Sequence, residues 1–212
     1  MNEAFFALPE EKRQNIINAA LEVFSRSDYK RASTDDIAAR AGISKGLLFY
    51  YFHNKKSLYL YLFDYIEQVM RDNLSGSDLW GVTDFFDFLE LGAERKAEIQ
   101  RKNPAIMDFS VRAFYSKGEE VSGDMAERLT AKMNSAFADY FKHIDFGKFR
   151  EGVDAGYLFR MLSWMTDGYL HERQMAGQPL EVSGMMGDFH RWVELFRRMV
   201  YKEEYLHEDD RA

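Results

Sequence analysis

Hydrophobic positions recur every three or four residues along almost the whole chain. Ile17, Leu21 and Phe24 share one face at helical spacing, and Pro9 stands at the first position of the helix that carries them, followed by two glutamates. No segment alternates between apolar and polar residues for long enough to predict a strand. The pattern therefore predicts an all-α fold.

Capping residues and breaks divide this pattern into separate helices. Ser33, Ser44 and Asn54 are placed to cap three helix starts, and Gly42 is placed to end the helix before the second of them. The helix that follows Asn54 is long and is expected to span 54–74. Five more helical stretches, giving about nine helices in all, are expected at 82–102, 104–116, 120–143, 153–176 and 185–203.

Composition places the chain among ordinary globular proteins, with 46% hydrophobic and 30% charged residues. The longest unbroken apolar run is Leu47–Phe52, far below the roughly 20 residues of a membrane span. Cysteine is absent, which excludes disulfides and cysteine-based metal sites and favours a reducing compartment. We expect a cytoplasmic protein with no membrane partner.

Charge is distributed unevenly along the chain, whose net charge is −7. Residues 1–60 carry nine Lys and Arg against seven Asp and Glu, a net charge of +2, whereas the remainder carries 19 against 28, a net charge of −9. A mildly basic head on an acidic body is typical of a protein that binds phosphates with one surface only.

The segment from Thr34 to Lys55 has the spacing of a helix-turn-helix. Gly42 can adopt the left-handed conformation that turns the chain between two short helices, and Ile37 and Leu48 can pack between them. On the second helix the outward arc carries Lys45, Gly46, Phe49, Tyr50 and His53, while Leu48, Tyr51 and Phe52 face inward. A lysine donates to guanine and an aromatic ring contacts thymine, so this arc suits DNA. The alternative is a helical hairpin whose aromatics face other helices.

Residues 33–58 read STDDIAARAGISKGLLFYYFHNKKSL, which resembles the signature of the TetR (tetracycline repressor) family of bacterial transcription regulators. The resemblance implies a homodimeric repressor that binds double-stranded DNA. It implies an N-terminal three-helix helix-turn-helix domain, residues 1–56, and a helical effector-binding and dimerisation domain, residues 57–212, connected by the helix 54–74. We expect a palindromic operator, released when a small, largely hydrophobic or aromatic effector binds.

Roles carry over from the family position by position. Lys45, Gly46 and Phe49 stand where the family reads base edges. The positions where it touches or approaches phosphates are Thr34, Ser44, Leu47, Tyr50, Tyr51 and Lys55. Leu47 replaces the family's usual threonine and offers no hydroxyl, and Asp35 is expected to complement the dipole of its own helix. Phosphate affinity is then expected to depend more on Lys30, Arg31, Lys55 and Lys56.

The C-terminal half is rich in aromatic residues and methionine. Its last two long helices each carry an apolar face that suits a dimer interface, and the residues expected there are Met161, Met165, Trp192, Phe196 and Met199. Aromatic residues that can line an apolar ligand cavity are Phe109, Phe114, Phe137, Phe141 and Trp164. For both sets the alternative is that the side chains close the monomer core.

Signatures of catalysis are absent from the sequence. It has no phosphate-binding loop, dinucleotide-binding glycine pattern or nucleophile elbow, and its five histidines lack metal-ligand spacing. We expect no enzyme activity, no cofactor and no metal. Two functions remain: a DNA-binding regulator that responds to a ligand, and a DNA-anchored protein–protein effector that binds no small molecule.

Overall fold

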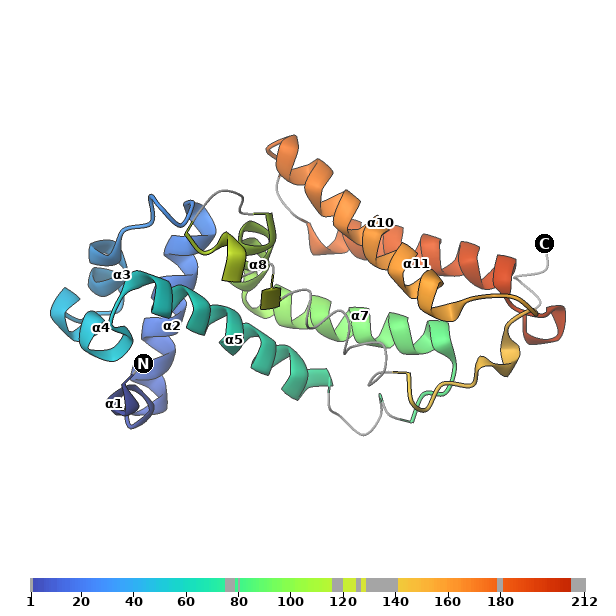
Figure 1. Ribbon diagram of the computed structural model, residues 1–212, viewed down its shortest axis with the longest axis horizontal. Coiled ribbons are helices and arrows are strands. Elements are labelled where there is room, and N and C mark those ends of the chain that lie inside the picture. Colours follow the sequence, from blue (N-terminus) through green and yellow to red (C-terminus); the bar gives the residue numbers. More distant parts are fainter. Residues whose placement is uncertain are drawn as a thin grey trace. The chain divides into compact units, whose positions relative to one another are not determined.

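The computed structural model describes residues 2–74, 79, 81–115, 120–124, 127–128, 141–178 and 181–206 (Figure 1). Within these residues the regular elements are helices, with one isolated β-bridge between Phe149 and Tyr201. The all-α prediction is confirmed. The α-helices are α1 (Glu3–Phe6), α2 (Glu10–Arg26), α3 (Thr34–Arg40), α4 (Lys45–Phe52), α5 (Lys55–Leu74), α7 (Phe85–Lys102), α8 (Pro104–Tyr115), α10 (Ala155–Met175) and α11 (Val182–Val200). The 3₁₀ helices are η1 (Phe146–Lys148) and η2 (Glu203–Tyr205).

The three predicted caps are confirmed by hydrogen bonds. The Ser33 hydroxyl accepts from the Asp36 backbone N–H at 3.2 Å, and the Ser44 hydroxyl accepts from that of Leu47 at 3.1 Å. The Asn54 side chain accepts from the Ser57 N–H at 2.8 Å. Each bond satisfies a backbone donor that has no partner within its own helix, which fixes where α3, α4 and α5 begin.

Two N-terminal details differ from the sequence expectation. Pro9 is the residue before α2 rather than its first residue, and it contributes no side-chain cap. The short helix α1 was not predicted, because a single turn carries no periodic signal. It is stabilised by the side chain of Asn2, which accepts from the Ala4 N–H, and by Phe5, which is fully buried.

The chain divides into two compact units. The first combines residues 1–71 with 102–132, and in it α2 packs against α8 and α3, while α1 and α3 each pack against α4. Rings from three of its helices meet in the core: Phe24 lies 5.0 Å from Tyr59, and Tyr59 lies 4.9 Å from Phe109, centroid to centroid. Ile37 and Leu48 are fully buried, as the helix-turn-helix spacing predicts.

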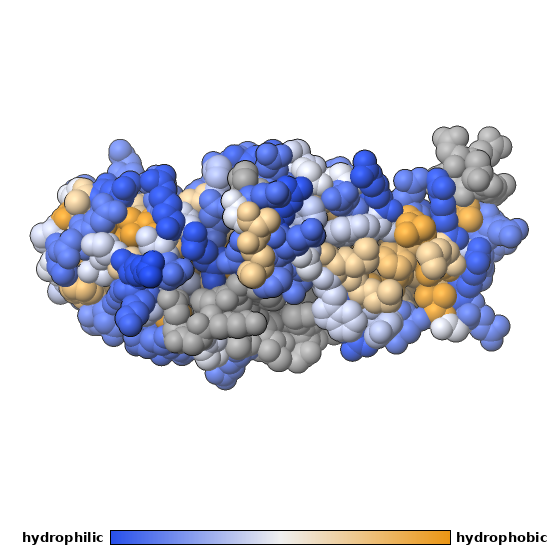
Figure 2. All heavy atoms as spheres, turned by 90° about the horizontal axis from the view of Figure 1, so that it is seen from above, coloured by the Kyte–Doolittle hydropathy of each residue, from blue (hydrophilic) through white to orange (hydrophobic). Residues whose placement is uncertain are grey.

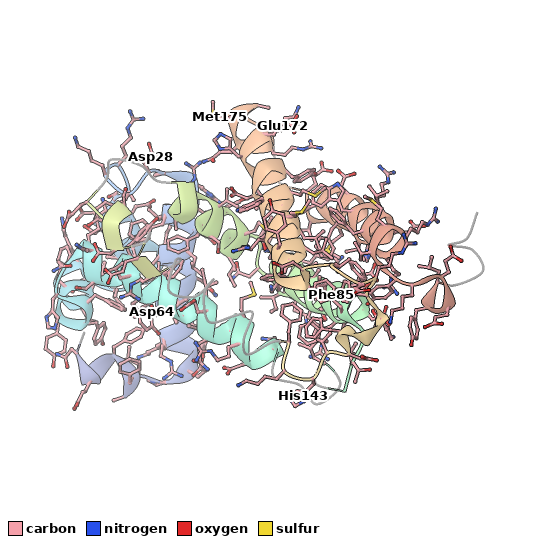
Figure 3. The ribbon with its side chains drawn as sticks, turned by 45° about the vertical axis from the view of Figure 1, so that its right-hand side comes forward. Asp28, Asp64, Phe85, His143, Glu172 and Met175 are labelled. Carbon is pink, nitrogen blue, oxygen red and sulfur yellow. The ribbon has the colours of Figure 1, made fainter. Side chains whose placement is uncertain are left out.

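The second unit combines residues 72–101 with 133–212. Its core is a cluster of aromatic side chains around Phe85, which is labelled at the start of α7 in Figure 3; Phe141 lies 5.1 Å from it and Phe149 lies 5.4 Å from it. Leu158 of α10 and Val193 of α11 close the same cluster. The helices predicted at 153–176 and 185–203 are thus α10 and α11, shifted by up to three residues at their ends.

Polar contacts hold the edge of this second core. Asp84 accepts from the N–H groups of Phe86 and Asp87 and so caps α7, while its other oxygen accepts from Lys148 Nζ at 2.7 Å. Arg197 of α11 lies 3.9 Å from the same carboxylate. Burial opposes ionisation of Asp84, but Lys148, the Asp87 N–H and Arg197 outweigh it, so its pKa lies below the ordinary value.

Some predictions lie beyond these observations. Most of the helix expected at 120–143 falls outside the described residues. The division at residue 56 into a DNA-binding and an effector-binding domain is a functional one and stays a prediction, since the boundary between compact units falls inside α5, between Arg71 and Asp72. In the part of the chain that the structure describes, no helix is long and apolar enough to cross a bilayer.

Candidate nucleic-acid interface

The segment from α3 to α4 forms two short helices around a sharp turn. Gly42 adopts a φ of +67°, and the Ile43 N–H donates to the Ala38 carbonyl at 3.0 Å, which ends α3. The left-handed backbone conformation at this position strongly favours glycine. Ser44 then caps α4 directly. Because the connection between the two helices is this short, α4 packs against α3. This is the geometry of a helix-turn-helix.

The outward face of α4 is exposed as predicted. Lys45, Gly46, Leu47 and Tyr50 are all exposed, with Tyr50 54% accessible, and Phe49 is half-buried. A Cβ added at Gly46 would approach only the Ser44 hydroxyl, at 3.9 Å. No neighbouring group of the protein therefore requires glycine at position 46. Because Gly46 has no side chain, another molecule can approach the helix backbone closely at this position.

The other residues predicted to contact phosphate differ in exposure. Ser44 is exposed, and Thr34 and Lys55 are half-buried. Tyr51 is 6% exposed, with its ring 5.8 Å from that of Phe5 and 5.7 Å from that of Tyr50. Its inward position was expected from the helical arc, and burial gives its ring a packing role. Contact of any of these residues with DNA stays a prediction.

Lys45 has a partner that sequence reasoning missed. Its ammonium lies 2.8 Å from Oδ2 of Asp35, across the turn, and 6.0 Å from the centroid of the Phe49 ring. Both side chains remain exposed, Lys45 by 48% and Asp35 by 69%. Asp35 lies in the first turn of α3, as its expected role at the helix dipole requires, and from there it also reaches the first residue of α4.

Other basic side chains of this unit are also paired. Arg40 binds Asp36 and Glu22, both at 3.1 Å, and the hydrogen bond with Asp36 raises the pKa of Arg40. Lys56 binds Asp124 at 2.8 Å, which raises the pKa of Lys56 and lowers that of Asp124.

Lys55 contacts a backbone carbonyl and an aromatic ring. Its ammonium donates to the Lys30 carbonyl at 3.2 Å and lies 4.8 Å from the centre of the Tyr29 ring. The carbonyl and the aromatic face both stabilise the positive charge of Lys55 at the start of α5.

The helices predicted to form a dimer interface carry exposed apolar side chains. Leu195 and Met199 of α11 are 55% and 58% exposed, and Trp164 of α10 is 53% exposed. Figure 2 shows hydrophobic side chains gathered over this part of the surface. Of the other predicted interface residues, Met161 and Met165 are half-buried, while Trp192 and Phe196 pack partly against the aromatic core.

The residues predicted to line a ligand cavity occupy different environments. Phe109 is fully buried in the first unit, and Phe141 is packed against Phe85 and Phe159 in the second. Trp164 is exposed beside Tyr157, which favours an interface over a cavity wall. The Phe114 side chain and Phe137 lie outside the described residues. Their role as a ligand site stays a prediction.

One described cavity lies between α7 and α11, within the second unit, with a volume of about 460 Å³. The residues lining it are Leu91, Glu94, Arg95, Glu98, Arg101, Met186 and His190. This lining is mostly charged, in contrast to the apolar cavity expected from the sequence, and includes none of the predicted ligand residues. The described residues contain no group of histidine and carboxylate side chains that could hold a metal ion.

Comparison with known proteins identifies the same segment. Residues 16–62 match the model of the family described as "Bacterial regulatory proteins, tetR family", a match that begins within α2, includes α3 and α4, and ends within α5. This family is the one that the sequence signature resembles.

Individual relatives extend the likeness. The transcriptional activator FasR of Mycolicibacterium smegmatis is 35% identical over 91 residues, which are 38% of this chain and 42% of FasR. The transcriptional regulator TtgR of Pseudomonas putida is 24% identical over 196 residues, covering 87% of this chain and 89% of TtgR. The structure of SmeT of Stenotrophomonas maltophilia, an efflux-pump repressor, in complex with triclosan has a TM-score of 0.71 at 18% identity, covering 93% of this chain and 95% of SmeT.

Proposed function

Because this chain belongs to the tetR family of bacterial regulatory proteins, we propose that it regulates transcription by binding a palindromic operator as a homodimer. In this proposal it acts as a repressor in the bacterial cytoplasm, and a small, largely hydrophobic ligand releases it from the operator. The observation that carries the proposal is the exposed face of α4. The cap at the start of α4 and the glycine turn before it hold this helix beside α3.

Base reading is assigned to the start of α4. An ammonium group at Lys45 donates to the acceptors of guanine in the major groove, and the ring of Phe49 contacts a thymine methyl. The open space at Gly46 lets the DNA approach the helix backbone. Of the remaining predicted residues, Thr34, Ser44, Tyr50 and Lys55 are proposed to fix the register of the helix through phosphates.

Dimerisation is assigned to α10 and α11. A single reading helix of eight residues reaches only a few base pairs, so useful specificity requires two of them on a symmetric site. The exposed Trp164, Leu195 and Met199 supply an apolar face on which a second copy can pack.

The ligand is proposed to be apolar and of modest size. SmeT is described in complex with triclosan, a chlorinated aromatic compound, and this chain is rich in aromatic side chains in its C-terminal half. Ligand and DNA are proposed to favour different states of the dimer, so that each weakens the binding of the other by the same factor.

Enrichment of random duplex DNA on the purified chain tests the first part of the proposal. We expect a consensus with two-fold symmetry whose half-sites lie about one helical turn apart or a multiple of it. Binding that shows no sequence preference at any salt concentration would contradict a role as a specific regulator.

The ligand is tested on the consensus duplex by adding triclosan and other apolar aromatic compounds. A compound that binds should weaken DNA affinity, and its own affinity should fall by an equal factor when the consensus duplex is present. Equal ligand affinity with and without DNA would contradict release by a ligand, and would favour the DNA-anchored effector instead.

A further inference from the structure

We infer that Asp35 is a specificity-determining residue, which makes Lys45 select neutral base edges over phosphates. The inference rests on the proposed function, because it concerns how the same face distinguishes an operator from other DNA. The observation behind it is the 2.8 Å contact between Asp35 Oδ2 and Lys45 Nζ, joining the first turns of α3 and α4.

The position of Lys45 explains why this partner matters. Lys45 is the first residue of α4, where the helix dipole is positive, and the first turn of α4 contains no acidic residue. The carboxylate that compensates the ammonium therefore comes from α3, across the turn that Gly42 fixes. Both side chains are exposed, so the pair stands on the face assigned to DNA rather than in the core.

A phosphate and a base edge compete differently for this ammonium. A phosphate brings a second negative charge within a few ångströms of Asp35, and the two anions repel each other. To bind the phosphate, the Lys45 ammonium must break its ion pair with Asp35. The Asp35 carboxylate then faces the DNA backbone without this lysine. Binding through phosphates, which dominates non-specific affinity, is weakened in this way.

A base edge imposes no such conflict. Guanine O6 and N7 are uncharged acceptors, and an ammonium carries three N–H donors, of which Asp35 occupies one. Lys45 can therefore keep Asp35 and still donate to a guanine. Asp35 also limits the directions in which the flexible lysine points, so less side-chain freedom is lost when the base is bound.

The replacement Asp35→Asn tests the inference, with a consensus duplex obtained by enrichment and a scrambled duplex of the same composition as probes. Affinity for the scrambled duplex should rise about fivefold at about 0.1 M salt, and log K against log salt should steepen by about 0.9 per subunit, the value for one added phosphate contact. Affinity for the consensus should change less, so the ratio of the two affinities falls.

Two further variants separate this mechanism from a change of net charge. Glu11→Gln removes one negative charge from the exposed start of α2, a different helix from those of Asp35 and Lys45, and should leave the affinity ratio unchanged. In a Lys45→Gln background, Asp35→Asn should no longer steepen the salt dependence, because the effect acts through Lys45. Asp35→Ser provides a second replacement if the asparagine variant folds poorly.

Each outcome is decisive. The inference is supported if Asp35→Asn lowers the ratio of consensus affinity to scrambled affinity when Lys45 is present but not in the Lys45→Gln background, and if Glu11→Gln leaves the ratio unchanged. An equal effect of Glu11→Gln, or an effect that persists without Lys45, overturns it. If the wild-type chain yields no consensus, the proposed function itself fails, whereas a wild-type consensus with an unchanged ratio in Asp35→Asn overturns only the role of Asp35.

Discussion

Lys45 and Lys55 stand at the starts of consecutive helices, but their ammonium groups have different surroundings. Lys45 is paired with a carboxylate on the exposed arc of α4, whereas Lys55 is held by a backbone carbonyl and an aromatic ring at the start of α5. Position, rather than pairing, is the basis for assigning Lys45 to base edges and Lys55 to phosphates: Lys45 begins α4, and Lys55 begins α5.

We expect Lys45→Ala to weaken binding to the consensus by about 1–3 kcal/mol and to relax the preference at one base pair per half-site. Lys55→Ala should weaken binding to all sequences alike and reduce the salt slope by about one unit per subunit. Titration of both variants against a consensus and its single-base variants distinguishes the two roles. A uniform loss in both variants, with sequence preference intact, would show that Lys45 does not read bases.

Asp84 gives the second unit a stability that depends on pH. Replacing it with asparagine keeps a capping group for α7 but removes the charge that binds Lys148 and Arg197, which are 25% and 12% exposed. We expect Asp84→Asn to lower the free energy of unfolding by about 1.5–3 kcal/mol at neutral pH, the range for hydrogen bonds to charged groups. Asp154→Asn is the matched control, because Asp154 caps α10 in an exposed position and should change stability by about 0.5 kcal/mol or less.

The pH dependence of this effect has a definite sign. The pKa of Asp84 is lower in the folded protein than in the unfolded chain, so the unfolded chain binds the proton more tightly. The stabilisation is therefore complete above the ordinary aspartate pKa and is lost as pH falls through the folded value. Denaturant unfolding at several pH values should show the wild type and Asp84→Asn converging in acid. A constant difference between them would contradict this account.

At the scale of elements, α1 supports α4, the helix to which base reading is assigned in the proposal. The ring of Phe5 lies 4.7 Å from that of Phe52 and 5.4 Å from that of Tyr61, and the Asn2 N–H donates to the carbonyl of Tyr51 at 2.8 Å. This bond satisfies a carbonyl at the end of α4 that the helix itself leaves without a partner. Helix α1 thereby joins α4 to α5.

Phe5→Ala should destabilise the first unit by about 3–5 kcal/mol, the range for removing a buried phenylalanine. The neighbouring Phe6→Ala is the control: Phe6 is 51% exposed, and its removal should cost about 1 kcal/mol or less. Urea unfolding measures both. Equal effects of the two replacements would mean that α1 does not anchor the unit through Phe5.

Local signals account for what the sequence predicted correctly. The caps at Ser33, Ser44 and Asn54 and the turn at Gly42 each depend on residues within four positions along the chain, so the sequence contains the whole interaction. The outward arc of α4 follows from helical geometry alone.

What the sequence did not reveal depends on distant partners. Phe5 is buried by residues about 50 positions away, which no local pattern encodes. Asp35 meets Lys45 because the turn folds α4 back against α3. Helical periodicity identifies an apolar face but does not show what covers it, and for that reason it did not reveal that Trp164 is 53% exposed.

At the scale of the whole molecule, the exposed apolar face of α10 and α11 predicts the oligomeric state. Figure 3 shows Glu172 and Met175 at the C-terminal end of α10, where Met175 is 75% exposed. Met199 and Leu195 lie on the surface of α11, so a charged residue there does not disturb the core of the subunit.

We expect the wild type to be a dimer and Met199→Glu or Leu195→Glu to shift it towards folded monomer, because an interface buries a new charge only at high cost. Tyr205→Glu, at an exposed tyrosine of η2, should leave the dimer intact. Sedimentation velocity measures the state and circular dichroism verifies the fold. A well-folded wild-type monomer at micromolar concentration would contradict the assignment.

The pairing of basic side chains with acids has a consequence for the number of molecules a cell requires. Lys45, Arg40 and Lys56 are each bound to a carboxylate of the protein itself. A genome offers about 10⁶–10⁹ competing sites, which hold most copies of a regulator away from its target. A surface that is already internally neutralised is sequestered less by the bulk chromosome. More copies then remain free to search, and a smaller cellular pool keeps the same promoter occupied.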